Sequence, residues 1–176
     1  RVPTFNDLYY LLIGNSRLRP ETTCQWNIGT TWAGRMGKVA DYVSFSLDAY
    51  YNKVKDKIVA VPTMFVWKMS NVGKVETYGV DANLAAEWAL AKAWNLSLTG
   101  AYSFMQAEDV TKRGSKLWRH QIAYTPKHSG GGSVVLEMPW MNVAYNVAWS
   151  GERYRLPQNK KSNLVNAYSD HSLSLY

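Results

Sequence analysis

The sequence predicts an all-β fold: an antiparallel, up-and-down β-barrel whose strands cross a membrane. The first observation is an alternation of apolar with small or polar side chains in at least five segments, which gives each strand one apolar and one polar face. The second is segment length, because strands of about nine to eleven residues suit a tilted transmembrane barrel. The third is composition: Trp and Tyr (8 and 12 residues) outnumber Phe (4), and both gather at membrane–water interfaces.

The expected strands and connections alternate along the chain. The strands, about seven or eight, share the period-two pattern, which covers residues 23–33, 42–54, 75–90, 94–104, 134–138, 141–149 and 167–176. Short turns are expected at residues 34–38, 91–93 and 139–140. Long connections are expected at residues 55–71, 106–120 and 151–166. Residues 122–133 fit the pattern less well, because Pro126 and the three glycines Gly130 to Gly132 interrupt it.

The alternation divides the residues of every strand between two faces. In the strand at residues 141–149, bulky apolar residues occupy the odd positions, and Asn or Ala the even ones. We expect the apolar parity to face lipid, as for Val80, Leu84, Trp88, Leu96, Val143 and Val147. We expect the opposite parity to face the barrel interior, as for Asp48, Asp81, Asn83, Glu87, Ser97 and Asn146.

Aromatic residues are expected to form two girdles at opposite strand ends. One set lies beside the short turns and comprises Trp32, Trp88, Trp94 and Trp140. The other lies beside the long connections and comprises Tyr51, Tyr78, Tyr102 and Trp149. In outer-membrane barrels the short turns are periplasmic and the long loops extracellular, so the second girdle is assigned to the extracellular side.

The charge distribution argues against a nucleic-acid partner. The formal net charge is +7, but the basic residues fall in the long connections. They do not follow a strand face studded with aromatic side chains that could stack bases. Solvated loop charge is therefore the favoured interpretation.

No motif for catalysis or metal binding is visible in the sequence. His120, His128 and His171 lie far apart, and none has a Ser, Cys or carboxylate at a catalytic spacing. The single cysteine, Cys24, has no His or acidic residue at metal-ligand spacing. No run of eighteen apolar residues exists, which excludes a transmembrane helix. We expect no enzyme activity, no cofactor and no metal.

Four segments carry a family resemblance. Residues 1–10 (RVPTFNDLYY), residues 14–21 (GNSRLRPE), residues 71–81 (NVGKVETYGVD) and residues 124–128 (YTPKH) occur in this order. They resemble signatures of the C-terminal barrel of TonB-dependent outer-membrane receptors. The first is most similar to receptors of the Bacteroidetes type, including those assigned to vitamin B12 and related compounds.

The resemblance implies that residues 1–176 form the C-terminal portion of a larger, 22-stranded barrel, a class with a plugged lumen. The resemblance implies that the plug domain lies outside these residues. The final strands are also expected to be missing, because Tyr176 is out of phase with Leu173 and Leu175. The chain starts without Met or an apolar signal segment, so we expect either a removed signal or a start inside a longer protein.

The resemblance also implies a function: active import of a scarce nutrient across the bacterial outer membrane. Cobalamin-like compounds, siderophores or other metal chelates, and glycans are the implied substrates. The TonB energy-coupling complex, outer-membrane lipid and a surface lipoprotein are the implied partners. The loop aromatics Tyr9, Tyr10, Trp67 and Trp118 are candidate ligand contacts, and Asp81, Asn83 and Glu87 are candidate contacts to the lumen or plug.

Two other interpretations fit the same alternation. One is a complete, small eight-stranded outer-membrane barrel with an adhesin or structural role, which should close its last strand on its first. The other is a soluble lipocalin-like binding module, which should turn its apolar parity inward.

Overall fold

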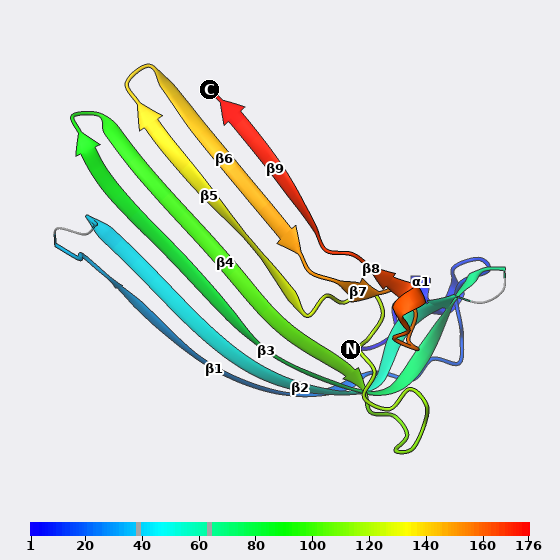
Figure 1. Ribbon diagram of the computed structural model, residues 1–176. Coiled ribbons are helices and arrows are strands. Elements are labelled where there is room, and N and C mark those ends of the chain that lie inside the picture. Colours follow the sequence, from blue (N-terminus) through cyan, green and yellow to red (C-terminus); the bar gives the residue numbers. More distant parts are fainter. Residues whose placement is uncertain (38–39, 63–64) are drawn as a thin grey trace.

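The computed structural model describes residues 1–37, 40–62 and 65–176, and most of them lie in one antiparallel sheet (Figure 1). Seven strands form this sheet: β1 (Thr22–Gly34), β2 (Tyr42–Pro62), β3 (Trp67–Ala91), β4 (Trp94–Asp109), β5 (His128–Met138), β6 (Met141–Ser150) and β9 (Tyr168–Leu175). The smaller elements are α1 (Phe5–Tyr9), β7 (Arg153–Tyr154), η1 (Lys161–Asn163) and β8 (Leu164–Val165). The predicted all-β, up-and-down fold is confirmed.

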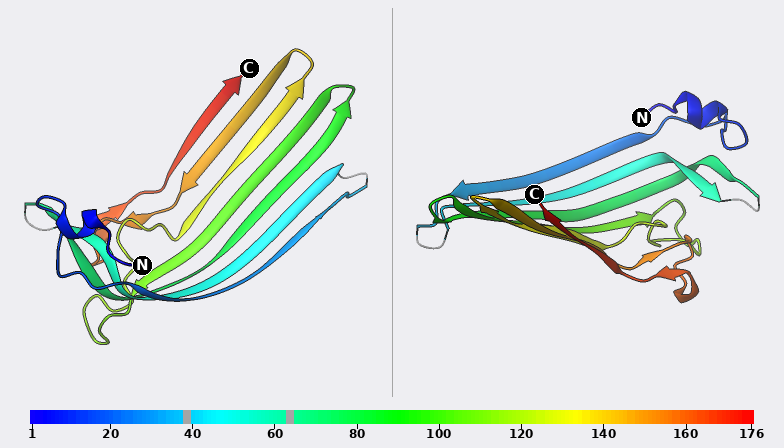
Figure 2. Two further views of the ribbon diagram at one scale, coloured as in Figure 1. Left: turned by 180° about the vertical axis from the view of Figure 1, so that it is seen from behind. Right: turned by 90° about the horizontal axis from the view of Figure 1, so that it is seen from above.

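The sheet is a curved, open wall (Figure 2). Its strands follow the order β1-β2-β3-β4-β5-β6-β9, so each strand pairs with its neighbour in sequence apart from the small β7–β8 hairpin. Within the described residues, β1 pairs only with β2 in this sheet, and β9 only with β6. The strands therefore do not close on themselves as a small eight-stranded barrel would.

The strand register joins residues of one parity into continuous rows. One row across the sheet is apolar or glycine and contains Phe45, Leu84, Gly100, Gly132 and Val147. The adjacent row is small or polar and contains Ser46, Asn83, Ala101, Gly131 and Ala148. The alternation in the sequence thus becomes one apolar face and one polar face of the wall.

The polar face is the hollow side of the wall. Shallow depressions of about 520 and 440 Å³ are lined mainly by residues of the polar parity, among them Ser46, Asn83 and Ser103. On the other face, Val80 and Leu84 are 36% and 42% exposed, so they are not buried in a core. A lipocalin-like module would bury that parity inside, so this alternative is wrong.

Little of the wall is buried by the chain itself. The accessible surface is 12088 Å². A compact monomer of 20.0 kDa would expose roughly 8,700 Å². The excess comes from a single layer of sheet with both faces uncovered, which is the expected geometry of a barrel wall.

Aromatic residues form bands at two levels of the sheet. Toward the long loops, Trp26, Tyr51 and Tyr78 lie opposite one another on β1, β2 and β3. Toward the short turns, Trp32 pairs with Phe45 and Trp88 with Leu96. Such bands are typical of membrane–water interfaces. The register places Tyr102 and Trp149, two other predicted members of the second girdle, in a separate row with Ala82 and Gly130.

The prediction of a long connection at residues 55–71 is wrong, because most of these residues lie in strands. β2 continues to Pro62 and β3 begins at Trp67, so the two strands form a long hairpin beyond the aromatic band. Strand β3, with 25 residues, is about 80 Å long, whereas a bilayer core is about 30 Å thick. The lysines Lys53, Lys55 and Lys57 had indicated a solvent-exposed loop. This segment is instead an extended strand, because it pairs with β3.

Two further boundaries differ from the sequence expectation. Strand β4 continues to Asp109 and so takes in the first four residues of the connection expected from residue 106. Strand β5 begins at His128, so Gly130 to Gly132 lie inside it. A Cβ atom at Gly130 would lie 2.7 Å from the carbonyl oxygen of Ala101, so glycine permits the close pairing with β4.

No helix among the described residues is long and apolar enough to cross a bilayer. The only α-helix of the described chain, α1, has five residues.

Candidate functional site

The connections between strands gather at the two ends of the wall (Figure 1). The short turns lie at one end, and we call it the short-turn end. At the other lie residues 1–21, the C-terminal end of β2 and the N-terminal end of β3, the β4–β5 loop (residues 110–127) and the β6–β9 connection (residues 151–167). We call this the long-loop end, and hydrogen bonds and ion pairs join several of its segments.

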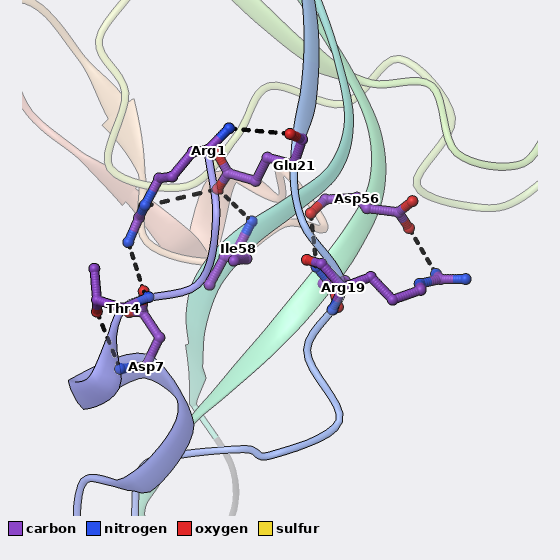
Figure 3. Close-up of polar contacts among 8 residues, drawn as sticks. Arg1, Thr4, Asp7, Arg19, Glu21, Asp56 and Ile58 are labelled. Atoms are coloured by element: carbon purple, nitrogen blue, oxygen red, sulfur yellow. Dashed lines mark hydrogen bonds and ion pairs between the residues drawn. The ribbon is translucent and has the colours of Figure 1, made fainter.

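The N-terminal segment, residues 1–21, is folded around Asp7. The main-chain N–H of Thr4 donates to Asp7 Oδ2 at 2.9 Å, and Asp7 N donates back to Thr4 Oγ1 at 3.3 Å, which makes a capping box for α1. The Arg1 guanidinium donates to the same carboxylate at 2.7 Å (Figure 3). The hydrogen bond from the main chain of Thr4, followed by contacts with the Thr4 side chain and Arg1, lowers the pKa of Asp7 below its ordinary value although burial opposes this.

The same segment is bound to the long hairpin of β2 and β3. Glu21 Oε1 accepts a hydrogen bond from Ile58 N at 2.7 Å, and Arg19 forms an ion pair with Asp56 at 2.6 Å (Figure 3). Asn71 Nδ2 donates to the carbonyl oxygens of Arg19 and Asp56. The signature residues 14–21 therefore act structurally, by joining the N-terminal segment to the hairpin.

The β4–β5 loop is held to the β6–β9 connection by Gln121. The Gln121 residue is only 4% exposed. Its side chain accepts a hydrogen bond from Ala107 N at 3.2 Å and donates one to Thr125 O at 3.3 Å. Its main chain donates to Asn159 Oδ1 at 2.6 Å and accepts from Asn159 Nδ2 at 3.0 Å. Two further bonds join the segments: Tyr124 N to Tyr154 O at 2.7 Å and His120 Nδ1 to Pro157 O at 2.9 Å.

A pocket of about 180 Å³ lies where these loops meet the hairpin, and we call it the long-loop pocket. Its apolar lining comprises Val59, Ala60, Val75, Ile122 and Ala123. Its polar and aromatic lining comprises Lys57, Trp67, Asp109, His120, Gln121, Tyr124 and Arg155, with Pro157 beside them. Strands β2, β3 and β4 supply one wall, and the two long loops supply the other.

The structure brings one of the four predicted ligand contacts to this pocket. Trp67 lines it and, as the first residue of β3, is not in an irregular loop as predicted. Tyr9 ends α1, packs on Phe5 at 5.1 Å and is 61% exposed, while Tyr10 follows it at the C-cap. Trp118 lies in a turn closed by its N–H bond to Ser115 O and is not among the residues that line the pocket.

Sequence reasoning did not select Lys57, His120, Tyr124 or Arg155 as site residues. They come from three separate segments, and nothing in their local sequence indicates that they converge. The YTPKH signature at residues 124–128 marked the neighbourhood of Tyr124 without indicating the pocket.

The three residues assigned to the lumen side lie on the polar face. Asp81 accepts a hydrogen bond from Ser103 Oγ at 2.5 Å, and Asn83 Nδ2 donates to Ser46 Oγ at 3.2 Å. Glu87 lies near the short-turn end, beside a depression lined by Arg35 and Tyr42. Asp81 is directly opposite Asp48 on β2, so this face carries negative charge in mid-wall.

No group of three or more potential metal ligands occurs within residues 1–37, 40–62 and 65–176. Two histidines, His128 and His171, lie on the apolar face, and each is paired with a tyrosine. His128 Nδ1 is 2.7 Å from Tyr102 Oη, and His171 Nδ1 is 2.6 Å from Tyr145 Oη. Each pair satisfies polar atoms on a face that is otherwise apolar.

A curved antiparallel wall with one apolar face, one polar face and packed loops at one end defines part of a large transmembrane β-barrel. The whole chain, residues 1–176, matches the family described as TonB dependent receptor-like, beta-barrel, and it belongs to that family. The resemblance seen in the sequence is confirmed.

Individual relatives agree with this assignment. The chain is 31% identical over 83 residues to the vitamin B12 transporter BtuB of Vibrio vulnificus (strain YJ016). Its fold is similar to that of the ferric yersiniabactin uptake receptor FyuA from Yersinia pestis, with a TM-score of 0.59 and 20% identity over 88% of the chain. It is also similar to the FrpB iron transporter from Neisseria meningitidis, with a TM-score of 0.53 and 9% identity over 93% of the chain.

The chain corresponds to a small part of each of these proteins. The match covers 46% of this chain and 13% of the vitamin B12 transporter. It covers 22% and 25% of the two solved receptors.

Proposed function

We propose that this chain is one part of the barrel wall of an active importer in the bacterial outer membrane. Membership of the TonB-dependent receptor family is the observation that carries the proposal. The two faces of the wall support it, because an apolar outer face suits lipid and a polar concave face suits a filled lumen. A transport role, and not catalysis, is consistent with relatives named as transporters and an uptake receptor.

The polar face would contact a plug domain supplied by the rest of the protein. Ser46, Asn83 and Ser103 present side-chain hydrogen-bonding groups along the concave side. Asn83 already pairs with Ser46, and Ser103 with Asp81, so a plug that buries this face must pair the donors and acceptors that these bonds leave unused. An unpaired buried polar group costs about 1–3 kcal/mol. Energy delivered by the TonB complex would then be used to break such contacts and open a path.

The substrate class that the long-loop end favours is an anionic compound or metal chelate. Basic residues dominate this end, including Lys55, Lys57, Lys112, Arg113 and Arg155. A cluster of one sign of charge attracts counter-charged solutes and raises their association rate. Cobalamin-like compounds, siderophores and glycans are the classes implied by the family resemblance, and anionic chelates fit this charge best.

Uptake assays test the importer proposal. Cells expressing the full-length receptor should accumulate a radiolabelled iron chelate or cobalamin only when the energy-coupling protein is present. Deletion of that protein should reduce uptake to the level of cells lacking the receptor. Uptake that persists after the deletion would show passive permeation and overturn the proposal.

A further inference from the structure

The long-loop pocket has the size of a single aromatic ring. Its volume is about 180 Å³. A cavity of about 150 Å³ holds one benzene molecule, and drug-sized ligands need about 300 Å³ or more. The pocket therefore accommodates one ring-sized group at the end of a larger compound, but not a whole large nutrient.

The lining combines flat aromatic surfaces with positive charge. Trp67 and Tyr124 are 47% and 57% exposed, so their rings are available to a ligand. Lys57 and Arg155 also line the pocket, and neither forms an ion pair with any described residue. Asp109 is the one carboxylate of the lining, and its Oδ1 atom already accepts a hydrogen bond from Thr111 N.

The loop residues of the pocket are held in place before any ligand arrives. His120 Nδ1 lies 2.9 Å from Pro157 O, and a carbonyl only accepts, so Nδ1 carries a proton and the ring orientation is fixed. Arg119 and Tyr124 lie at the two ends of the loop segment that lines the pocket, and each has a φ angle of 59°. Non-glycine residues in this region are uncommon and persist where surrounding contacts determine the backbone, often at ligand sites. Arg155 N is bonded to Asn163 O at 2.8 Å.

We propose that the long-loop pocket binds a one-ring aromatic group that carries an anionic substituent, as the recognised end of the imported compound. The ring would pack against Trp67, Tyr124 and the apolar lining. The anionic substituent would pair with Lys57 and Arg155, whose charges no described carboxylate neutralises by an ion pair. This inference rests on the proposed importer function, because it names the substrate class of that receptor.

Equilibrium binding to the purified full-length receptor in detergent tests the inference. The probe is 4-fluorobenzoate, followed by its ¹⁹F NMR line width, with the neutral 4-fluorobenzamide as the chemical control. We expect saturable binding of the acid and binding of the amide that is at least about tenfold weaker, since a charge-assisted hydrogen bond contributes roughly that factor. Equal binding of both probes, or no saturable binding of the acid, would overturn the proposal; the latter would indicate that another part of the receptor fills the pocket.

Variants locate the binding. Lys57→Gln and Arg155→Gln should each weaken 4-fluorobenzoate binding about tenfold. The matched control is Lys116→Gln, because Lys116 is exposed in the same loop region and does not line the pocket. Ala123→Trp should fill the pocket and abolish binding, with folding checked by heat-modifiable migration in gels. Unchanged binding in Lys57→Gln and Arg155→Gln, or equal weakening in Lys116→Gln, would show that the site is elsewhere.

The binding assay contains no energy-coupling protein, so its result is independent of the uptake assay. Uptake that persists without the coupling protein would refute the importer proposal and leave the measured affinity intact. Loss of binding specificity would refute the pocket assignment and leave energy-dependent uptake intact.

Discussion

Single residues of the wall show why some signature positions accept only one side chain. Gly79, within the segment Tyr78 to Asp81, lies on β3 opposite Met105 of β4. A Cβ atom added there would overlap the carbonyl oxygen of Phe104 and the phenol ring of Tyr50. At Gly100, in contrast, nothing lies within 4 Å of an added Cβ atom. Two glycines in the same sheet thus have different structural roles.

This contrast gives the first prediction. Gly79→Ala should destabilise the full-length receptor by about 1–3 kcal/mol, because the β3–β4 main chains must move apart. Gly100→Ala should be neutral or stabilising by up to about 1 kcal/mol, because it only restricts the unfolded chain. Urea unfolding from lipid vesicles measures both. A similar loss of stability in the two variants would contradict the steric argument.

Asp7 gives a pH-dependent prediction at the same scale. Its pKa in the folded segment is lowered, mainly by the hydrogen bond from Thr4 and then by Arg1, so the carboxylate stabilises the segment at pH values above its ordinary pKa. That stabilisation is lost as the pH falls through the lowered pKa, which lies below the ordinary value of an Asp carboxyl. The protection of residues 1–21 against hydrogen exchange in the full-length receptor should therefore weaken as the pH falls towards this lowered pKa.

The matched variants separate Asp7 from other carboxylates. Asp7→Asn should weaken protection at pH 7 by about 1–2 kcal/mol, since bonds to charged groups contribute about 1.5–3 kcal/mol. It should also remove part of the acid dependence. Glu152→Gln, at an exposed position, should change neither. An unchanged acid dependence in Asp7→Asn would assign the effect to another group.

At the scale of elements, the long-loop end is organised by a contact between two loops. Gln121 and Asn159 are 38 residues apart, yet they exchange hydrogen bonds at 2.6 and 3.0 Å. Asn159 has a φ angle of 47°, a backbone region that Asn tolerates better than most residues. The two loops therefore behave as one unit that closes one side of the pocket.

Weakening either side of this contact should loosen both loops together. Gln121→Ala keeps the main-chain bonds to Asn159 but removes the side chain that anchors residue 121 to β4, which leaves the buried N–H of Ala107 without its partner and should cost about 1–3 kcal/mol. Asn159→Gly keeps access to the positive φ but removes the bonds to Gln121, so it isolates the effect of the side chain. Hydrogen exchange should increase in residues 120–127 and 154–163 in both variants. Gln158→Ala, at an exposed neighbouring position, is the control, and an equal increase there would refute the linkage.

The same elements show what the sequence could and could not predict. Strand faces depend on a local period of two, so the parity of Leu84 and Asn83 could be deduced without a structure. The extension of β2 beyond residue 54 could not, because Lys55 and Lys57 indicate solvent and pairing with β3 is a long-range property. The convergence of Lys57 and Arg155 on one pocket likewise depends on loop contacts that leave no local pattern.

At the scale of the whole molecule, the two faces of the wall should tolerate charge very differently. Leu84 belongs to the apolar row and Asn83 to the polar row, although they are adjacent in β3. Leu84→Arg should cost about 2–4 kcal/mol of folding free energy in a bilayer if its row lies near the midplane. Asn83→Arg should cost far less. Equilibrium folding of the full-length receptor into vesicles measures the difference, and equal costs would contradict the assignment of the faces.

The open edges of the wall lead to the last prediction. Within the described residues, the outer edges of β1 and β9 have no strand partner in the sheet. In a bilayer each unpaired main-chain N–H or C=O costs several kcal/mol, so these edges must pair with other strands. We expect residues 1–176 expressed alone to aggregate in vesicles, while the full-length receptor migrates as a compact, heat-modifiable monomer. The aggregation would follow from edge-to-edge pairing of identical walls, because each wall offers the unpaired groups that the other lacks. A monodisperse, heat-modifiable monomer of residues 1–176 would show that β1 and β9 close on each other, and it would require a smaller barrel than the open curvature of this wall indicates.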